Sequence, residues 1–535
     1  MFATTGFLPA LRAREARIQP RTFFALAFVA LLALHARSLY DPPYWDALVG
    51  AFPQGYWLAR NDFDLVRLVT MEPTCGEGGP NVYPYSIYPL GIALLYALHL
   101  PTQVVFLVMH LFALLSAATA ATAFFVLARE RLPAPLGSLA TLLLVSTPIF
   151  QSLASQMNMD MALCACTIVS LLALVRRKFG VAFLAALLAL LVIPRGVILV
   201  AANASFLGLA AFRPSWTGLS GRGAEPQSPR GVQAWTLAHL GLLGIFLVEI
   251  QIARAYANLP VHVGLFEGFG QFFRQALWMI PEFGAVFLAA LLCGLMVFRR
   301  ARRGEARPLD FACAMHLLVF VVFYGQYKNT LPRYFFQVYP HVILLVLAAA
   351  PAAARLRWLA PAAVTLAIAA NAVNHEGAFY HHHGSGWATP PTAKASPLSA
   401  DGHLLERSMK YRQDLLLGLD VARYLERFER DRLLVVANWP LAQALAVPEF
   451  GYVDRAWSVS SRPRLTYAPQ SVHFDNIYDR TGGLLRPKTR TDVLWAIVPN
   501  AYFRPGLAPR EGYDEVLAIL EHGGFEAFLF RRGSQ

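Results

Sequence analysis

Long hydrophobic stretches, separated by short polar and often basic segments, run through the first 373 residues of the chain. A helix needs about 20 apolar residues to cross the hydrocarbon core of a bilayer. The stretch Tyr88–Leu100 is shorter, and we predict an interfacial or re-entrant helix there. The remaining stretches predict eleven transmembrane helices, near residues 22–38, 103–128, 134–151, 159–175, 179–193, 195–212, 232–252, 281–298, 310–325, 335–350 and 357–373.

Basic residues set the orientation of this arrangement. With the N-terminus in the cytoplasm, 19 Lys and Arg residues fall in inner loops and 7 in outer loops before residue 374. This asymmetry follows the rule that cytoplasmic loops are enriched in positive charge. Counting Tyr88–Leu100 as a full span would invert every later loop and place the run RRARRGEAR outside. We therefore predict an odd number of spans, which puts the C-terminus outside the cell.

The composition changes after residue 373. Residues 374–400 contain HHHGSGWATPPTAKASP, which predicts a linker, and residues 401–535 predict a small α/β domain outside the cytoplasm. DRLLVVAN and TDVLWAIV have the character of short buried strands, and VARYLERFER and YDEVLAILEHGG that of amphipathic helices. The fold class predicted is therefore an α-helical polytopic membrane protein, residues 1–373, with a C-terminal α/β domain.

The composition agrees with a lipid environment. Of the 535 residues, 56% are hydrophobic and 15% charged, whereas a typical globular domain has about 25% charged residues. The net charge of +13 does not favour a nucleic-acid-binding protein, because the basic residues form short clusters between apolar stretches. The five cysteines show no zinc-ligand spacing, and we interpret them as small buried hydrophobes.

Acidic residues gather in the first external loop, residues 39–102. They are Asp41, Asp46, Asp62, Asp64, Glu72 and Glu77. Ionisable groups at the membrane boundary are costly and often mark a functional site. Asp46 is favoured as a general base, because the apolar run ALVGAF follows it and should hold it at the membrane surface. A solvated loop charge is the alternative interpretation of each acid.

A second group of charged residues is predicted on the same side. Asp160 starts a span and is a candidate second carboxylate, although an acid there also favours a helix N-terminus. Arg195, Lys328 and Arg333 lie in or beside outer turns and are candidate ligands of a phosphate group. The alternative interpretation of these three basic residues is snorkelling, in which a long basic side chain at a helix end reaches toward water.

These features together resemble the GT-C glycosyltransferases. They are the acidic motif after the first span, a long first external loop ending in a YPL run, a second Asp in the next external loop, and a late PRY before a span. The resemblance covers roughly residues 20–373. It is to the bacterial branch related to aminoarabinose transferase, protein mannosyltransferase and the Rgt-type lipopolysaccharide sugar transferases.

The resemblance implies transfer of a sugar from a polyprenyl-phosphate carrier to a lipid, glycan or protein acceptor at the outer face of the bacterial inner membrane. It implies that Asp46, or in second place Asp41, acts at the catalytic centre with Asp160. It also implies that Lys328 and Arg333 contact the carrier phosphate, with Arg195 as a further candidate. This chain reads WDAL where the family often has an Asp-Glu pair, which leaves the base and a divalent metal open; no other cofactor is implied. The alternative function is a polytopic transporter or lipid-carrier flippase.

Overall fold

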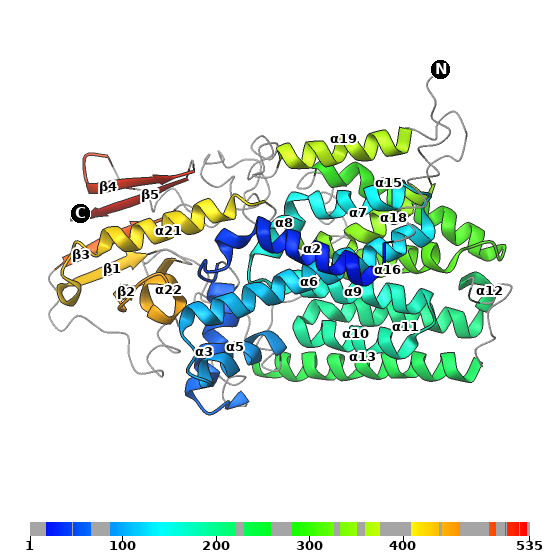
Figure 1. The fold of residues 1–535 in the computed structure, drawn as a ribbon. Helices are drawn as coiled ribbons and strands as arrows, with labels where there is room; N and C mark the ends of the chain where they lie inside the picture. The colour runs from blue at the N-terminus through cyan, green and yellow to red at the C-terminus, as the bar shows by residue number, and fades with distance from the viewer. Residues whose placement is uncertain are drawn as a thin grey trace, which may run out of the picture.

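The computed structural model consists of a helical bundle and a C-terminal α/β region (Figure 1). It describes residues 18–44, 47–65, 86–217, 219, 229–257, 281–325, 332–349, 359–374, 408–437, 441–460, 492–498, 509, 511–523 and 525–531. The predicted linker, residues 374–400, lies almost entirely outside these ranges.

Every predicted span corresponds to an apolar helix or to a pair of helices in the bundle. They are α2 (Pro20–Leu34), α6 (Thr102–Arg131), α7 (Leu136–Ser146) with α8 (Pro148–Ser155), α9 (Met159–Val175), α10 (Phe179–Val192), α11 (Val197–Phe212), α13 (Pro229–Ala257), α15 (Pro281–Arg302), α16 (Pro308–Tyr324), α17 (Pro332–Phe335) with η4 (Phe336–Val338) and α18 (Tyr339–Ala349), and α19 (Leu359–Val373). These helices run side by side in Figure 1. Where the structure breaks a span, a Pro stands at or near the start of the next helix, as at Pro148.

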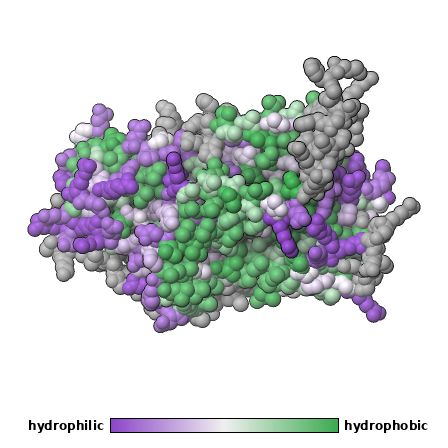
Figure 2. Space-filling view, in the orientation of Figure 1, coloured by the Kyte–Doolittle hydropathy of each residue, from purple (hydrophilic) through white to green (hydrophobic). Residues whose placement is uncertain are grey.

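The exterior of the bundle is apolar, and Figure 2 shows a hydrophobic surface between two more polar ends. Leucines that are more than half exposed occur on several helices; they include Leu26, Leu184, Leu237, Leu292 and Leu366. Exposed apolar surface of this extent is unfavourable in water and is typical of a membrane-contacting surface. Among the described residues, three helices are long and apolar enough to cross a membrane, and the bent pair α7–α8 would make a fourth. The number of eleven spans therefore remains a prediction.

Arginines gather at one end of the bundle, which we call the basic end. Arg129 donates from Nη1 to the carbonyl oxygen of Ile18, before α2, at 2.9 Å. Arg131, at the end of α6, forms a two-point ion pair with Asp310 at the start of α16, at 2.6 and 2.9 Å. Helix starts and helix ends thus meet at the basic end, so these helices alternate in direction. We call the opposite end, where α2 finishes and α9 begins, the distal end.

Short helices of the first loop cover the distal end. They are η1 (Ala36–Ser38), the five-residue π-helix η2 (Ala47–Ala51), α3 (Phe52–Arg60) and α5 (Ile87–Ala97). The 11-residue helix α5 begins one residue before the stretch for which a short helix is predicted and ends three residues before its end. At about 1.5 Å per residue it is too short to cross a bilayer. It packs against α3, where the side chain of Ile92 fills the space beside Gly55.

The C-terminal region is a five-stranded sheet covered by a helix. The strand order is β2-β1-β3-β5-β4, with β1 (Leu433–Ala437) parallel to β2 (Ser458–Ser460) and β3 (Asp492–Ile497), and with β5 (Phe525–Arg531) antiparallel to β3 and β4 (Glu515–His522). Helix α21 (Tyr411–Leu425) lies on β4 and β5, and α22 (Leu441–Ala446) lies beside β1 and β2. The predictions of buried strands in DRLLVVAN and TDVLWAIV are confirmed by β1 and β3.

Two predictions for this region need correction. Residues 513–524, predicted as an amphipathic helix, contain the edge strand β4, which pairs with β5 across the turn at Gly523. The Gly-Gly pair before FEAFLF is a hairpin signal that outweighs the helical spacing, because the strand gains a partner immediately after the turn. The helix predicted over residues 421–430 starts earlier and ends at Leu425.

The C-terminal region and the first-loop helices share one hydrophobic core. Its buried members include Phe52, Trp57 and Ile92 from the first loop and Leu415 and Trp457 from the C-terminal region. The ring of Phe52 meets that of Phe450 edge-on, at 6.5 Å between centroids. Because this core is continuous, the C-terminal region is packed directly on the distal end of the bundle.

Candidate active site

Asp160 lies at the distal end, in the first turn of α9. The side chain of Asn158 caps this helix, since its Oδ1 accepts the backbone N–H of Asp160 at 2.9 Å. The helix start predicted for this segment is therefore confirmed. The Asp160 side chain is only 4% exposed, so its negative charge requires a partner.

Two arginines from distant parts of the chain supply the opposite charge. Arg195, in the turn η3 (Pro194–Gly196) between α10 and α11, places Nη1 2.7 Å from Oδ1 of Asp160. Arg333, in α17, places Nε 3.6 Å from Oδ2 of the same carboxylate, and its side chain is 5% exposed. Three of the six predicted site residues thus meet in one buried cluster, which we call the Asp160 cluster.

Aromatic rings hold the two guanidinium groups. The Arg195 guanidinium lies over the ring of Tyr334, with Cζ 3.9 Å from the ring centroid, and that of Arg333 lies 5.4 Å from the same centroid. The ring of Tyr334 stacks in turn on that of Tyr324, at the end of α16, with 5.6 Å between centroids. Stacking of this kind restrains planar cations and favours their charged form.

Two guanidinium groups make the Asp160 cluster suitable for an anionic ligand. They lie beside one carboxylate in a site with little access to water. Arginine is well suited to this role, because its planar fork binds two oxygens of a phosphate at once.

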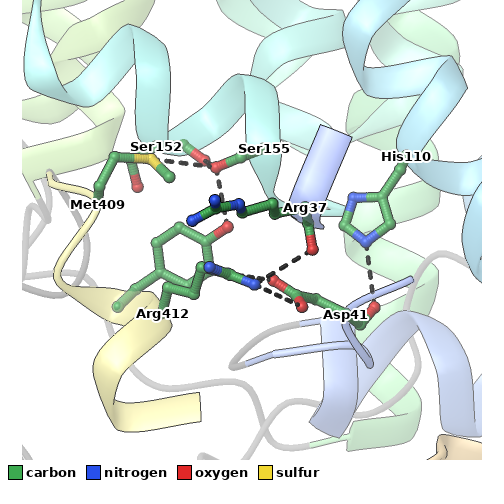
Figure 3. Close-up of polar contacts among 8 residues, drawn as sticks. Arg37, Asp41, His110, Ser152, Ser155, Met409 and Arg412 are labelled. Atoms are coloured by element: carbon green, nitrogen blue, oxygen red, sulfur yellow. Dashed lines mark hydrogen bonds and ion pairs between the residues drawn. The ribbon is translucent and has the colours of Figure 1, made fainter. Parts of the chain in front are cut away.

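Asp41 belongs to a separate cluster at the same end (Figure 3). Its carboxylate pairs with Arg412 of α21, whose Nε lies 2.8 Å from Oδ2 and whose Nη2 lies 3.4 Å from Oδ1. The hydrogen bond to Asp41 raises the pKa of Arg412. The imidazole of His110, on α6, lies 3.1 Å from the backbone oxygen of Asp41. Asp41 is therefore held from the C-terminal region and from the bundle, and both of its oxygens face Arg412.

Two of the predicted site residues, Asp46 and Lys328, lie outside the described residues. The nearest described residues on either side of Asp46, Tyr44 and Ala47, are both buried. Of the predicted site residues, Asp160, Arg195 and Arg333 lie together. Asp41 is placed in its own cluster.

Sequence reasoning missed several polar residues near these clusters. Arg412 has no motif of its own, and only its tertiary pairing with Asp41 marks it. Gln337 and His341 follow Arg333 at intervals of four residues along α17, η4 and α18, and both are buried. His341 Nε2 lies 3.0 Å from Nδ1 of His316 on α16. The regular spacing from Arg333 was the available signal, since buried polar residues on one helix face are typical of a site inside a membrane protein.

The described residues contain no group of three or more His, Cys, Asp and Glu side chains that could hold a metal ion. The acids of the first loop at positions 46, 72 and 77 lie outside the described ranges. Metal dependence of this site therefore remains open.

No protein-family model and no curated protein matches the chain. Two solved structures are similar to it, both of ArnT from Cupriavidus metallidurans. For the apo crystal structure the TM-score is 0.47 at 14% identity, covering 96% of this chain and 98% of that chain. For the crystal structure bound to undecaprenyl phosphate the TM-score is 0.46 at 14% identity, covering 94% of this chain and 97% of that chain. These similarities assign no residue and no activity to this chain.

Proposed function

We propose that this protein is a membrane glycosyltransferase of the GT-C type, which moves a sugar from a polyprenyl-phosphate carrier to an acceptor of the cell envelope. The observation that carries the proposal is the Asp160 cluster, in which two arginines from distant parts of the chain meet at one buried carboxylate. In this reading Arg195 and Arg333 bind the phosphate of the donor, and Asp160 holds the two guanidinium groups in place.

The position of the cluster suits a ligand that is partly lipid. The Asp160 cluster lies where α9 begins and where α10 turns into α11, at the end of helices whose outer surfaces are apolar. A polyprenyl chain can remain beside such surfaces while its phosphate reaches the helix ends. A soluble nucleotide-sugar donor would not need this apolar approach.

The proposed chemistry uses one base and two cations. An acceptor hydroxyl attacks the anomeric carbon of the sugar and loses its proton to a carboxylate, for which Asp46 is our candidate. The new bond joins the acceptor oxygen to the anomeric carbon, and the bond from that carbon to the carrier phosphate breaks. The phosphate leaves with an additional negative charge, and the two arginines stabilise that charge without rearranging.

The proposal gives different roles to the carboxylates. Asp160 is paired with Arg195 at 2.7 Å, and taking up a proton would break this pair. A positioning role therefore fits Asp160 better than the role of base. We place the protein in the bacterial inner membrane, with the distal end and the C-terminal region outside the cytoplasm, where lipid, glycan and protein acceptors are all available.

A transfer assay tests this function against the alternative of a transporter or flippase. Mass spectrometry of envelope glycolipids from a strain without the gene first identifies the missing sugar and its acceptor. Purified protein in lipid nanodiscs is then given the polyprenyl-phosphate sugar and that acceptor. Because a nanodisc has no separate compartments, formation of the glycosylated product there indicates chemistry and not transport.

Matched variants connect the activity to the site. Arg195→Gln and Arg333→Gln should each lower transfer by about 10²–10³-fold, the usual effect of removing one group that stabilises charge in the transition state. Arg423→Gln is the control, because that side chain is 71% exposed on α21. Lipid translocation in sealed vesicles without any glycosylated product would overturn the proposal in favour of a flippase.

A further inference from the structure

Side chains at the start of α21 contact the distal end of the bundle, outside the C-terminal region to which α21 belongs. They are Met409, Tyr411, Arg412 and Asp414, which we call the clasp (Figure 3 draws part of it). The contacts of the clasp reach two separate segments, residues 37–44 and the end of α8 at Ser155. Such a concentration of polar contacts at one helix start is not needed to fold the sheet itself.

Arg412 makes the central contact of the clasp. It pairs with both oxygens of Asp41 and also donates from Nη2 to the backbone oxygen of Arg37 at 3.1 Å. The Asp41 side chain is 12% exposed and that of Arg412 27% exposed, so the pair is largely removed from water. A shielded, two-point ion pair fixes both orientation and distance.

Flanking contacts fix the first loop and the end of α8. The hydroxyl of Tyr44 donates to Oδ2 of Asp414 at 2.7 Å, and Tyr44 stands two residues before Asp46. The hydroxyl of Tyr411 donates to Oγ of Ser155 at 2.8 Å, at the last residue of α8. The Oγ of Ser155 also lies 3.3 Å from Sδ of Met409. The clasp therefore contacts both the first loop and the end of α8.

A short, well-bonded segment connects the clasp to the Asp160 cluster. Four residues separate Ser155 from Asp160. Between them, Gln156 donates from Nε2 to Oγ of Ser152 at 2.7 Å, and Asn158 caps α9. The buried side chain of Met157 joins the core that the first loop shares with the C-terminal region. A displacement at Ser155 would therefore be transmitted to the start of α9.

We propose that the clasp is a positioning device that makes the C-terminal region part of the transfer site. Arg412 fixes Asp41 and the first loop, while Tyr411 fixes the end of α8 and, through it, Asp160. In this reading Asp41 is a positioning residue and does not act as the base. The inference rests on the proposed function, since it assigns the contacts of the clasp to that site.

A double-mutant cycle tests the role of the central pair. Asp41→Asn, Arg412→Gln and the double variant keep the shapes of both side chains, and transfer is measured for each in nanodiscs. If the pair only positions the loop, each single variant should lose about 10- to 100-fold in activity. The double variant should then be no worse than either, because the shared contact is lost only once. Arg423→Gln, on the same helix, should behave as wild type.

Docking of the C-terminal region on the bundle is measured separately from sugar-transfer activity. A protease site is inserted in the predicted linker, residues 374–400, and the cut protein is purified through a tag on the bundle. The C-terminal region should remain bound in wild type and dissociate more readily in the Arg412→Gln and Tyr411→Phe variants. This readout does not depend on sugar transfer, so a failed docking prediction is distinct from a failed function.

Two results would overturn the proposal. The first is that Asp41→Asn, alone or combined with Arg412→Gln, is at least 10²-fold less active than Arg412→Gln alone. Loss of the ion pair should lower activity similarly in both single variants, whereas loss of a base lowers it further only in the variants that lack the Asp41 carboxylate. The second is unchanged docking in the Arg412→Gln variant together with full activity. Lack of transfer by the wild-type protein with every acceptor identified would instead contradict the proposed function and leave the docking measurement to decide on the clasp.

Discussion

The ion pairs of the Asp160 cluster predict that its three members respond differently to neutral substitution. Both guanidinium groups lie beside the carboxylate of Asp160. Arg333→Gln or Arg195→Gln removes one of these two contacts and leaves the other. Asp160→Asn removes the carboxylate from both arginines at once.

The magnitudes follow from distance and burial. Two unit charges about 4 Å apart interact with about 4 kcal/mol at an effective dielectric constant of about 20. Breaking a buried pair by removing one partner typically costs about 3–5 kcal/mol. Asp160 is 4% exposed and its oxygens lie 2.7 and 3.6 Å from the two arginines, so Asp160→Asn should lose stability in this range. Arg333→Gln should cost less, because the closer pair with Arg195 survives.

Ligand binding should show the opposite order of effects, with Arg333→Gln weakening it more than Asp160→Asn. Arg333→Gln removes a candidate donor to the phosphate, and a lost hydrogen bond to a charged group is worth about 1.5–3 kcal/mol. Affinity for polyprenyl phosphate should therefore fall about 10- to 150-fold. Thermal unfolding in detergent measures the stability of each variant, and titration of polyprenyl phosphate into nanodiscs measures binding. The control is Arg423→Gln, whose exposed pair with Asp420 should contribute at most about 1 kcal/mol.

The reasoning fails if Asp160→Asn unfolds no more easily than Arg333→Gln. It also fails if Arg333→Gln binds polyprenyl phosphate as tightly as the wild-type protein. In the first case the contacts of Asp160 with the two arginines would contribute little to stability. In the second case Arg333 would not bind an anionic ligand at this site.

Three other substitutions separate chemistry from structure. Asp46→Asn should bind the donor normally but transfer sugar about 10²–10⁴-fold more slowly, and near wild-type transfer in the nanodisc assay would remove Asp46 from the role of base. Asn203→Leu removes the 2.8 Å bond from Nδ2 to Ser170 Oγ between α11 and α9, and should cost about 0.6–1.7 kcal/mol in thermal unfolding while activity is kept. Gly451→Ala should loosen the C-terminal region in the linker-cleavage assay, because Gly451 has φ +79° and an added Cβ would lie 2.6 Å from a ring carbon of Phe106; unchanged docking would contradict the close approach to α6.

Local sequence patterns were sufficient to predict most of the helices. The run Met159–Val175 is mostly apolar and Asp160 is its one charged residue, and the observed helix α9 occupies the range predicted for it. This works because the burial of an apolar run depends mainly on its length and composition, whatever its neighbours. The strand over residues 433–437 was predictable for the same reason, since it is a short apolar run of β-branched and aliphatic residues.

Pairing across the fold decided what local patterns could not. Residues 515–522 are a strand because β5 lies beside them, and their own spacing favours a helix. The type and position of each residue could nominate Asp160, Arg195 and Arg333 separately. They could not show that both arginines lie beside the carboxylate of Asp160.

The sequence by itself thus determined which segments are apolar and which charged residues lie at their ends. Only the tertiary structure decided which of those charges meet. Asp41 and Arg412 are 371 positions apart and still form a two-point ion pair. The physical reason is that an ion pair depends on distances of a few ångströms between side chains. Those distances are set by how α21 packs on the distal end of the bundle, and no local pattern encodes that packing.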